Sequence, residues 1–99
     1  MYKFTGWMLP TGILFDRYAV RDWMGAQVQT SKYFLGLAAG TTGHVVGVLE
    51  VAHNQLLLVV EWDSTDATAR RMDCFSQSEA EQYLLRVLAP VRVEVRVKL

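Results

Sequence analysis

Residues 56–63, Leu-Leu-Leu-Val-Val-Glu-Trp-Asp, are predicted to form a strand, and they begin with the longest apolar run of the sequence, residues 56–60. Because neighbouring side chains of a strand point to opposite faces, this strand is apolar on both. Something must therefore cover each face: the interior of a barrel on one, and on the other the N-terminal segment, a C-terminal helix or a second copy of the protein. The two sets are Leu57 with Val59, and Leu56 with Leu58, Val60 and Trp62.

A hairpin is predicted around this strand. Residues 44–51 read as its antiparallel partner, and residues 52–55 join the two strands with Asn54 as the turn residue. Upstream, residues 26–30 alternate like a short strand, and residues 31–42 read as a long loop that contains glycines. These elements together indicate an antiparallel sheet.

A further strand is predicted over residues 68–75, although the pattern leaves open which of its faces is buried. The faces are Arg70, Met72 and Cys74 on one side, and Arg71, Asp73 and Phe75 on the other.

A helix is predicted to follow, because Ser76 and Ser78 each stand three residues before a glutamate, a spacing typical of a capping box. Pro90 is expected to end this helix. Residues 91–99 then alternate valine with charged residues, which predicts a last strand guarded as a sheet edge. The apolar helix positions, three and four apart, are Ala80, Tyr83, Leu84, Val87 and Leu88.

Residues 1–24 show no clear period. Their apolar spacing favours a short amphipathic helix over residues 13–24 with Thr11 as its cap, while the β-branched and aromatic content leaves an extended conformation open. Gly25 is the expected boundary between this N-terminal extension, packed on a barrel, and the barrel itself over residues 25–99.

The composition is that of one globular domain. The chain has 99 residues, of which 52% are hydrophobic and 20% charged, and its formal net charge is zero, so no overall field attracts nucleic acid or anionic lipid. Cys74 is the only cysteine, which excludes an internal disulfide and predicts a buried thiol in a reducing compartment. No apolar run is long enough to span a membrane, and no export signal is recognisable, so we expect a cytoplasmic protein.

A loop motif carries a resemblance to a known group of proteins. Residues 40–43, Gly-Thr-Thr-Gly, have the form G-T-x-G and lead into residues 45–48, Val-Val-Gly-Val, of the form V-x-x-V. With the order of elements given above, this resembles the SH3-like small barrels of bacterial proteins, many of them uncharacterised. The resemblance covers about residues 25–99. It implies a mainly β (α+β) fold, a five-stranded SH3-like barrel with an N-terminal extension and a short helix before the last strand.

The resemblance does not imply one activity. Similar barrels occur in translation and transcription factors, in peptide-binding adaptors and in type II dihydrofolate reductases, whose barrels assemble around a shared pore. The Val-Gln-Ile-Tyr pore strand of that last family is absent from this chain, which argues against its activity.

The residues that could carry catalysis are sparse. The glycine loop of residues 36–43 lacks the Gly-Lys-Ser/Thr ending of a phosphate loop, and His44 and His53 have no partners at metal-ligand spacing. Glu61, Asp63 and Asp66 form an acidic cluster that reads as a solvated turn, because no nucleophile or ion-binding loop accompanies it. No cofactor or metal is therefore expected, and catalysis is disfavoured.

Aromatic and basic residues are the remaining candidates for a site. Aromatic side chains of the long loop and the strand ends approach one another in an SH3-like barrel and predict a groove for peptides or bases, with core packing as the alternative for each. The candidates for binding are Tyr33, Phe34, Trp62 and Phe75, of which Tyr33 is the one most expected to be exposed. The candidates for a nucleic-acid face are Arg70, Arg71, Arg92, Arg96 and Lys98, for which edge protection is the simpler explanation.

Three functions stay open at this point. The first is a non-enzymatic binding module that presents the region of Tyr33, Phe34 and Trp62 to a protein partner or to another copy of itself as a homo-oligomer. The second is a nucleic-acid-binding barrel that uses the arginines. The third is an oligomeric small-molecule-binding protein or enzyme with a site between subunits.

Overall fold

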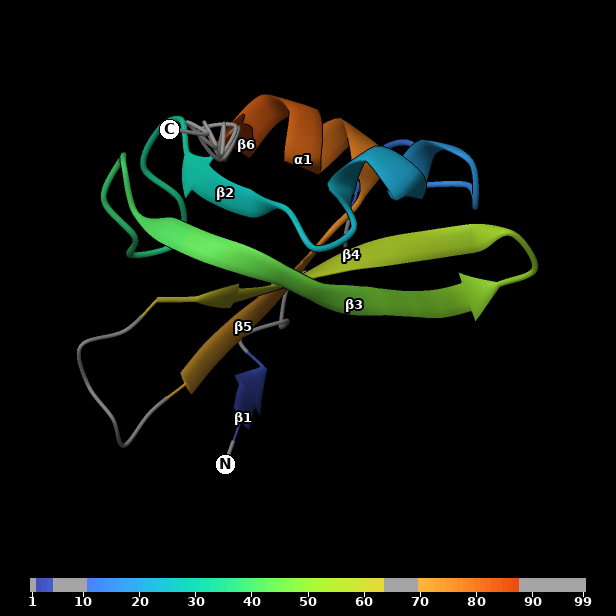
Figure 1. Cartoon of the computed structure of the whole chain (residues 1–99), viewed down its shortest axis with the longest axis horizontal. Helices are drawn as coiled ribbons and strands as arrows, with labels where there is room; N and C mark the ends of the chain where they lie inside the picture. The colour runs from blue at the N-terminus through green and yellow to red at the C-terminus, as the bar shows by residue number, and fades with distance from the viewer. Residues whose placement is uncertain (1, 5–10, 64–69, 88–99) are drawn as a thin grey trace, which may run out of the picture.

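The computed structural model describes residues 2–4, 11–63 and 70–87 (Figure 1). They form one six-stranded sheet of order β1-β5-β4-β3-β2-β6, in which β1 runs parallel to β5 and all other neighbours are antiparallel. Within these residues β1 and β6 lie at opposite edges and do not pair, so the fold is mainly β with an open sheet. The strands are β1 (Tyr2–Phe4), β2 (Gln27–Thr30), β3 (Thr42–Ala52), β4 (Gln55–Trp62), β5 (Arg70–Phe75) and β6 (Leu84–Val87), and the helices are the 3-10 helix η1 (Ala19–Trp23) and α1 (Gln77–Tyr83).

The predicted hairpin is confirmed in β3 and β4. Its turn is tighter than residues 52–55, since Ala52 already pairs with Gln55 and only His53 and Asn54 lie between them. Asn54 has φ 55°, the left-handed region that asparagine tolerates better than most residues. The turn chemistry therefore sets where the strands reverse.

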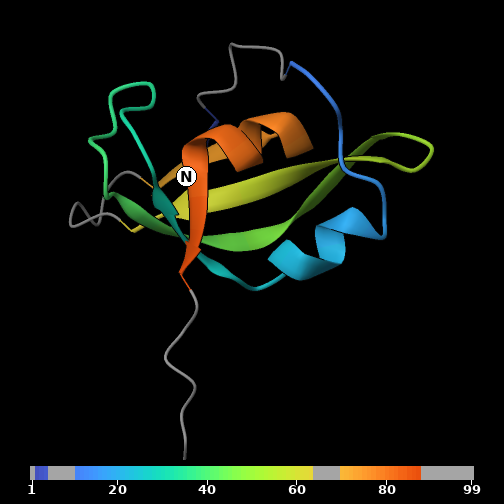
Figure 2. The ribbon, with the colours of Figure 1, turned by 90° about the horizontal axis from the view of Figure 1, so that it is seen from above.

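The core lies on one face of the sheet, and the even-numbered positions of β4 form its centre. Leu58 and Val60 are fully buried, and Trp62 is 3% exposed. Both helices lie on the same side of the sheet (Figures 1 and 2), where Ala80 of α1 and Trp23 of η1 belong to this core. The predicted division of the strand into two apolar faces is confirmed, because Leu57 is also buried on the opposite side.

Pairing with β4 decides which face of β5 is buried. Phe75 lies opposite Leu58, and Asp73 lies opposite Val60. Residues paired in this way share a face of the sheet, so Phe75 and Asp73 are buried with the core, at 0% and 2% exposure. Cys74 points to the other face and is partly buried.

The start of the helix is confirmed, but its predicted end is wrong. Ser76 is the N-cap of α1, and its backbone N–H donates to Glu79 Oε1 over 3.1 Å in a complete capping box. The helix ends at Tyr83, well before Pro90, and residues Leu84–Val87 pair with β2 as β6. The open edge of β2 offers this segment hydrogen-bond partners, so a strand replaces the last helical turn.

Ser76 joins the helix to the N-terminal arm, here meaning residues 11–24, and a Ser76→Ala variant tests how much this contact stabilises the protein. The Ser76 Oγ accepts from the Glu79 N–H over 3.2 Å and donates to the Thr11 carbonyl over 2.6 Å. Ser76→Ala is expected to lower the free energy of unfolding by ~1–2 kcal/mol, measured by urea denaturation. Glu81→Ala, an exposed change on the same helix, serves as the control. Equal losses for the two variants would contradict a specific role for the cap.

Residues 11–24 combine a β-bridge at Phe15 with the 3-10 helix η1. The helix predicted over residues 13–24 is reduced to the 3-10 helix η1, and the cap assigned to Thr11 is wrong. Phe15 instead bridges Leu56 through two backbone hydrogen bonds of 3.0 and 2.8 Å. These bonds, together with burial of the Phe15 ring, favour the extended alternative at this point. The strand predicted over residues 91–99 lies outside the described residues.

Candidate functional site

The predicted binding aromatics separate into three core residues and one surface residue. Phe34, Trp62 and Phe75 are 8%, 3% and 0% exposed, whereas Tyr33 is 68% exposed. The rings of Phe34 and Phe75 lie 5.0 Å apart, and those of Trp62 and Phe75 lie 6.2 Å apart in an edge-to-face arrangement. The three buried rings thus pack in the core, and Tyr33 is the only one of the four candidates that is exposed to solvent.

A buried carboxylate joins one predicted aromatic to one predicted basic residue. Asp73 Oδ2 accepts from Trp62 Nε1 over 2.7 Å and from Arg71 Nε over 2.9 Å. Arg71 is the one candidate of the basic face whose side chain is described, and it is engaged in this internal pair. The side chain of Arg70, the residues Arg92, Arg96 and Lys98, and the acidic residue Asp66 lie outside the described part of the structure.

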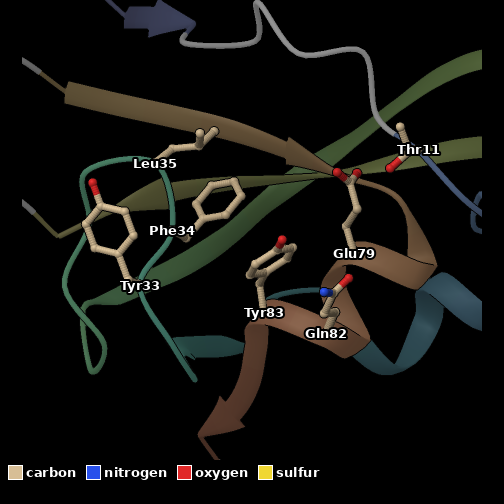
Figure 3. A pocket seen from close by; sticks show the side chains of 7 residues that line it. All are labelled: Thr11, Tyr33, Phe34, Leu35, Glu79, Gln82 and Tyr83. Atoms are coloured by element: carbon tan, nitrogen blue, oxygen red, sulfur yellow. The ribbon is translucent and has the colours of Figure 1, made fainter.

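A small pocket of about 160 Å³ opens beside Tyr33 (Figure 3). The loop side chains Tyr33 and Phe34 line one side of the pocket, and α1 contributes Glu79, Gln82 and Tyr83 on the other. The Glu79 carboxylate already accepts from the backbone N–H of the helix cap. Three aromatic side chains therefore line the pocket, and its one carboxylate already accepts a hydrogen bond from the same chain.

Polar residues at the start of β3 form a second small cluster. Asp63 accepts from the Thr42 hydroxyl over 2.8 Å and lies 2.9 Å from His44 Nδ1. All three residues face solvent to some degree, and they tie the start of β3 to the end of β4. The described residues contain no group of three or more His, Cys, Asp and Glu side chains arranged to hold a metal ion.

Cys74 is a poor nucleophile in this setting. Burial raises the pKa of its thiol, and the neighbouring Asp73 carboxylate raises it further. The thiolate, which is the reactive form of cysteine, is therefore disfavoured at neutral pH.

The open edge of β3 is the feature that the sequence analysis missed. β2 has four residues and β3 has eleven, so β2 covers only the first part of its neighbour, up to the bond from the Val45 N–H to the Ala26 carbonyl. Beyond Val45, residues 46–51 have no strand on that side in the described part of the chain. Exposed apolar side chains line this edge: Val46 at 52%, Val48 at 40%, Leu49 at 46% and Val51 at 50%.

The mismatch in strand length was the signal that could have revealed this edge. The predicted strands over residues 26–30 and 44–51 already differ in length, and the longer one must extend past the shorter.

No helix among the described residues is long and apolar enough to cross a membrane. Protein-family models, curated proteins and solved structures contain no match to this chain.

Proposed function

We propose that this protein is an interaction module that binds another polypeptide by adding a strand to the open edge of β3. The observation that carries the proposal is the exposed, largely apolar stretch of residues 46–51, which pairs with no strand on its outer side among residues 2–4, 11–63 and 70–87. A strand edge presents a row of free N–H and C=O groups, and an extended peptide satisfies them by main-chain hydrogen bonds.

The chemistry of the edge indicates what kind of segment it accepts. Proteins protect exposed edges with lysine, proline, inward-pointing charges or β-bulges. Residues 46–51 contain no lysine or proline, and the β3–β4 register is irregular between Val45 and Gly47 and between Glu50 and Ala52, so Gly47–Glu50 are the regular part of this edge. Their one charged residue is Glu50, whose carboxylate lies 3.7 Å from the Arg17 guanidinium of the same chain. The edge is therefore locally neutral, and the favoured partner is an extended, apolar and uncharged segment.

The order of the strands supports an SH3-like architecture for the module. The order β6-β2-β3-β4-β5, with α1 between β5 and β6, follows the succession of strands, hairpin and short helix on which the resemblance rests. In this arrangement the far half of the β3–β4 hairpin projects beyond the short β2 (Figure 2). We propose that this projecting half is the binding element.

A peptide titration followed by ¹⁵N NMR tests the proposal. A short peptide of alternating threonine and valine is expected to shift the amide signals of residues 46–51, and the same peptide with a central proline is expected not to, because proline removes a donor. Val48→Lys places a charge on the edge. The apparent affinity for the peptide, taken from the amide shifts, should fall at least tenfold.

Tyr33→Ala is the matched control, since it changes an exposed side chain of the aromatic pocket rather than the edge. Its titration should equal that of the unchanged protein. If Tyr33→Ala abolished the shifts and Val48→Lys did not, the aromatic pocket would be the binding site and the proposal would be wrong.

A further inference from the structure

We infer that the pocket beside Tyr33 binds a compact organic cation, an ammonium group that carries alkyl substituents. The pocket is separate from the open edge of β3, so this inference does not depend on the proposed function. It rests on three features of the described residues: the aromatic rings that line the pocket, one carboxylate beside them, and a lysine of the same chain that already lies over one of the rings.

Three aromatic rings border the same small cavity. The ring centroids of Phe34 and Tyr83 lie 5.0 Å apart, and the ring planes are inclined at 56°. Tyr33 precedes Phe34 in the loop and adds a third ring, which is exposed (Figure 3). The face of an aromatic ring carries partial negative charge and attracts a cation placed over it. Rings gathered around one cavity can therefore contribute to binding the same cation.

Glu79 adds a full negative charge to the pocket. Among the described residues it is the only charged side chain that lines the cavity. Its Oε1 accepts from the Ser76 N–H over 3.1 Å, and its Oε2 accepts no hydrogen bond from the described residues. An anionic ligand would be repelled by this carboxylate, and a neutral apolar ligand would displace its water without replacing the lost hydrogen bonds. A cation is the ligand that suits both the carboxylate and the rings.

Lys32 shows that the Tyr83 ring attracts an ammonium group. The Lys32 Nζ lies 4.8 Å from the centroid of this ring. Lys32 is exposed and does not line the pocket, and its flexible side chain can turn away into water. Two positive charges beside one ring repel each other, so a bound cation is expected to compete with Lys32 for Tyr83.

Backbone hydrogen bonds hold the walls of the pocket in place. The Ser31 N–H donates to the Tyr83 carbonyl over 2.8 Å, and the Ser31 hydroxyl donates to the Gln82 carbonyl over 3.2 Å. Phe34 and Leu37 exchange two further backbone bonds of 3.0 and 2.7 Å. The loop is thus tied to the end of α1, and the turn that carries Phe34 is closed. A site formed in advance loses little ordering entropy when a ligand binds.

The size of the pocket limits the ligand to a small group. Its volume of about 160 Å³ is below the ~300–1,000 Å³ of pockets that enclose drug-sized ligands. An unsubstituted ammonium is strongly hydrated, whereas alkyl groups weaken its hydration and add surface for the rings to contact. We therefore expect a trimethylammonium group, carried either by a small molecule such as choline or by a trimethylated lysine side chain.

A titration with choline, followed by ¹⁵N NMR, tests the site on the unchanged protein. Choline is expected to shift the amide signals of residues 33–35 and 79–83. The matched probe is the alcohol in which a tert-butyl group replaces the trimethylammonium group, because it has the same shape without the charge. It is expected to bind much more weakly. Equal affinities for the two probes, or no shift at these residues, would overturn the inference.

A peptide with one trimethyllysine identifies the source of the cation, with the same peptide carrying unmodified lysine as its control. Tighter binding of the trimethylated peptide than of choline would assign the site to a modified protein side chain. Equal or weaker binding would assign it to a free small molecule. The peptide should in either case shift the signals of residues 33–35 and 79–83 and not those of residues 46–51.

Two substitutions test the charges separately. Glu79→Gln removes the negative charge but keeps an acceptor for the capping box, in which glutamine also serves, and should weaken choline binding about tenfold. Glu81→Gln is the matched control, because Glu81 is exposed on the same helix and does not line the pocket. Lys32→Gln removes the competing cation and should strengthen choline binding about two- to fivefold.

The variants can also contradict the inference. Unchanged choline binding in Glu79→Gln would overturn the role of the carboxylate, and weaker binding in Lys32→Gln would overturn the competition for Tyr83. Neither result would affect strand addition at β3, because that proposal uses other residues and another probe. The failure of one proposal is therefore distinguishable from the failure of the other.

Discussion

Replacing Phe75 by alanine is expected to lower the free energy of unfolding by ~3–5 kcal/mol, the usual cost of truncating a buried phenylalanine. The ring is fully buried and contacts both Phe34 and Trp62, so its removal leaves a cavity bordered by two large rings. Domains of this size have a total stability of roughly 5–15 kcal/mol, so a large part of it would be lost. Urea unfolding followed by circular dichroism measures the effect.

Tyr33→Ala is the control for this prediction, because Tyr33 is also an aromatic residue near α1 but is 68% exposed. Its loss should change stability by less than ~0.5 kcal/mol, as for most surface substitutions. A Phe75→Ala variant as stable as Tyr33→Ala would show that the three buried rings do not form the core described above.

Asp73→Ala is expected to cost ~3 kcal/mol, because the Trp62 and Arg71 side chains lose the carboxylate that accepts from both. The buried Trp62 Nε1–H would lose its hydrogen-bond acceptor. Arg71 can instead turn toward water, because 24% of its side chain is exposed. Most of the loss should therefore come from the tryptophan side of the pair. Urea unfolding gives the free energy, and the indole N–H signal of Trp62 reports its hydrogen bond.

Asp73→Asn separates the loss of charge from the loss of the acceptor. Asparagine keeps an oxygen that can accept from Trp62, so this variant should recover part of the lost stability and hold the indole signal near its original position. Asp63→Ala, at a carboxylate exposed to solvent, should cost much less. If Asp73→Asn were as unstable as Asp73→Ala, the charge and not the tryptophan hydrogen bond would be the main contribution.

The hairpin and the capped start of α1 could be predicted because their determinants are local. Asn54 tolerates the left-handed conformation that the turn requires, and Ser76 stands at the spacing from Glu79 that a capping box needs. The alternation of side chains along a strand likewise assigns Leu56 and Leu57 to opposite faces, and both are buried. Each of these features depends on residues a few positions apart.

The end of α1 could not be predicted in this way. Residues Leu84–Val87 continue a helical pattern of apolar positions, yet they form β6 because the edge of β2 is within reach. The same limit applies to the aromatic candidates. From the sequence, Phe34, Trp62 and Phe75 could belong either to the core or to a binding groove. The packing of the loop against α1 and β5 shows that they belong to the core.

The open edge of β3 shows a third kind of limit. The sequence contains its apolar residues and its lack of guarding charges, but an edge exists only relative to the strand beside it. The boundary of β2 at Gln27 and Thr30 decides how much of β3 is left without a neighbour. Strand ends are assigned least reliably from sequence, so the difference in predicted strand length indicates an open edge, but only the structure fixes its extent.

The bonds between the N-terminal arm and the start of α1 have a consequence for how the protein is made. The Ser76 hydroxyl donates a hydrogen bond to the Thr11 carbonyl, and the Ile13 N–H donates one to the Ser78 hydroxyl. In each bond the two residues are 65 positions apart in the sequence. A growing chain that emerges from the ribosome N-terminus first cannot form these contacts until residues 76–78 have been synthesised. Non-local contacts of this kind also slow folding. These contacts therefore form only after the segment that contains Ser76 and Ser78 has left the ribosome.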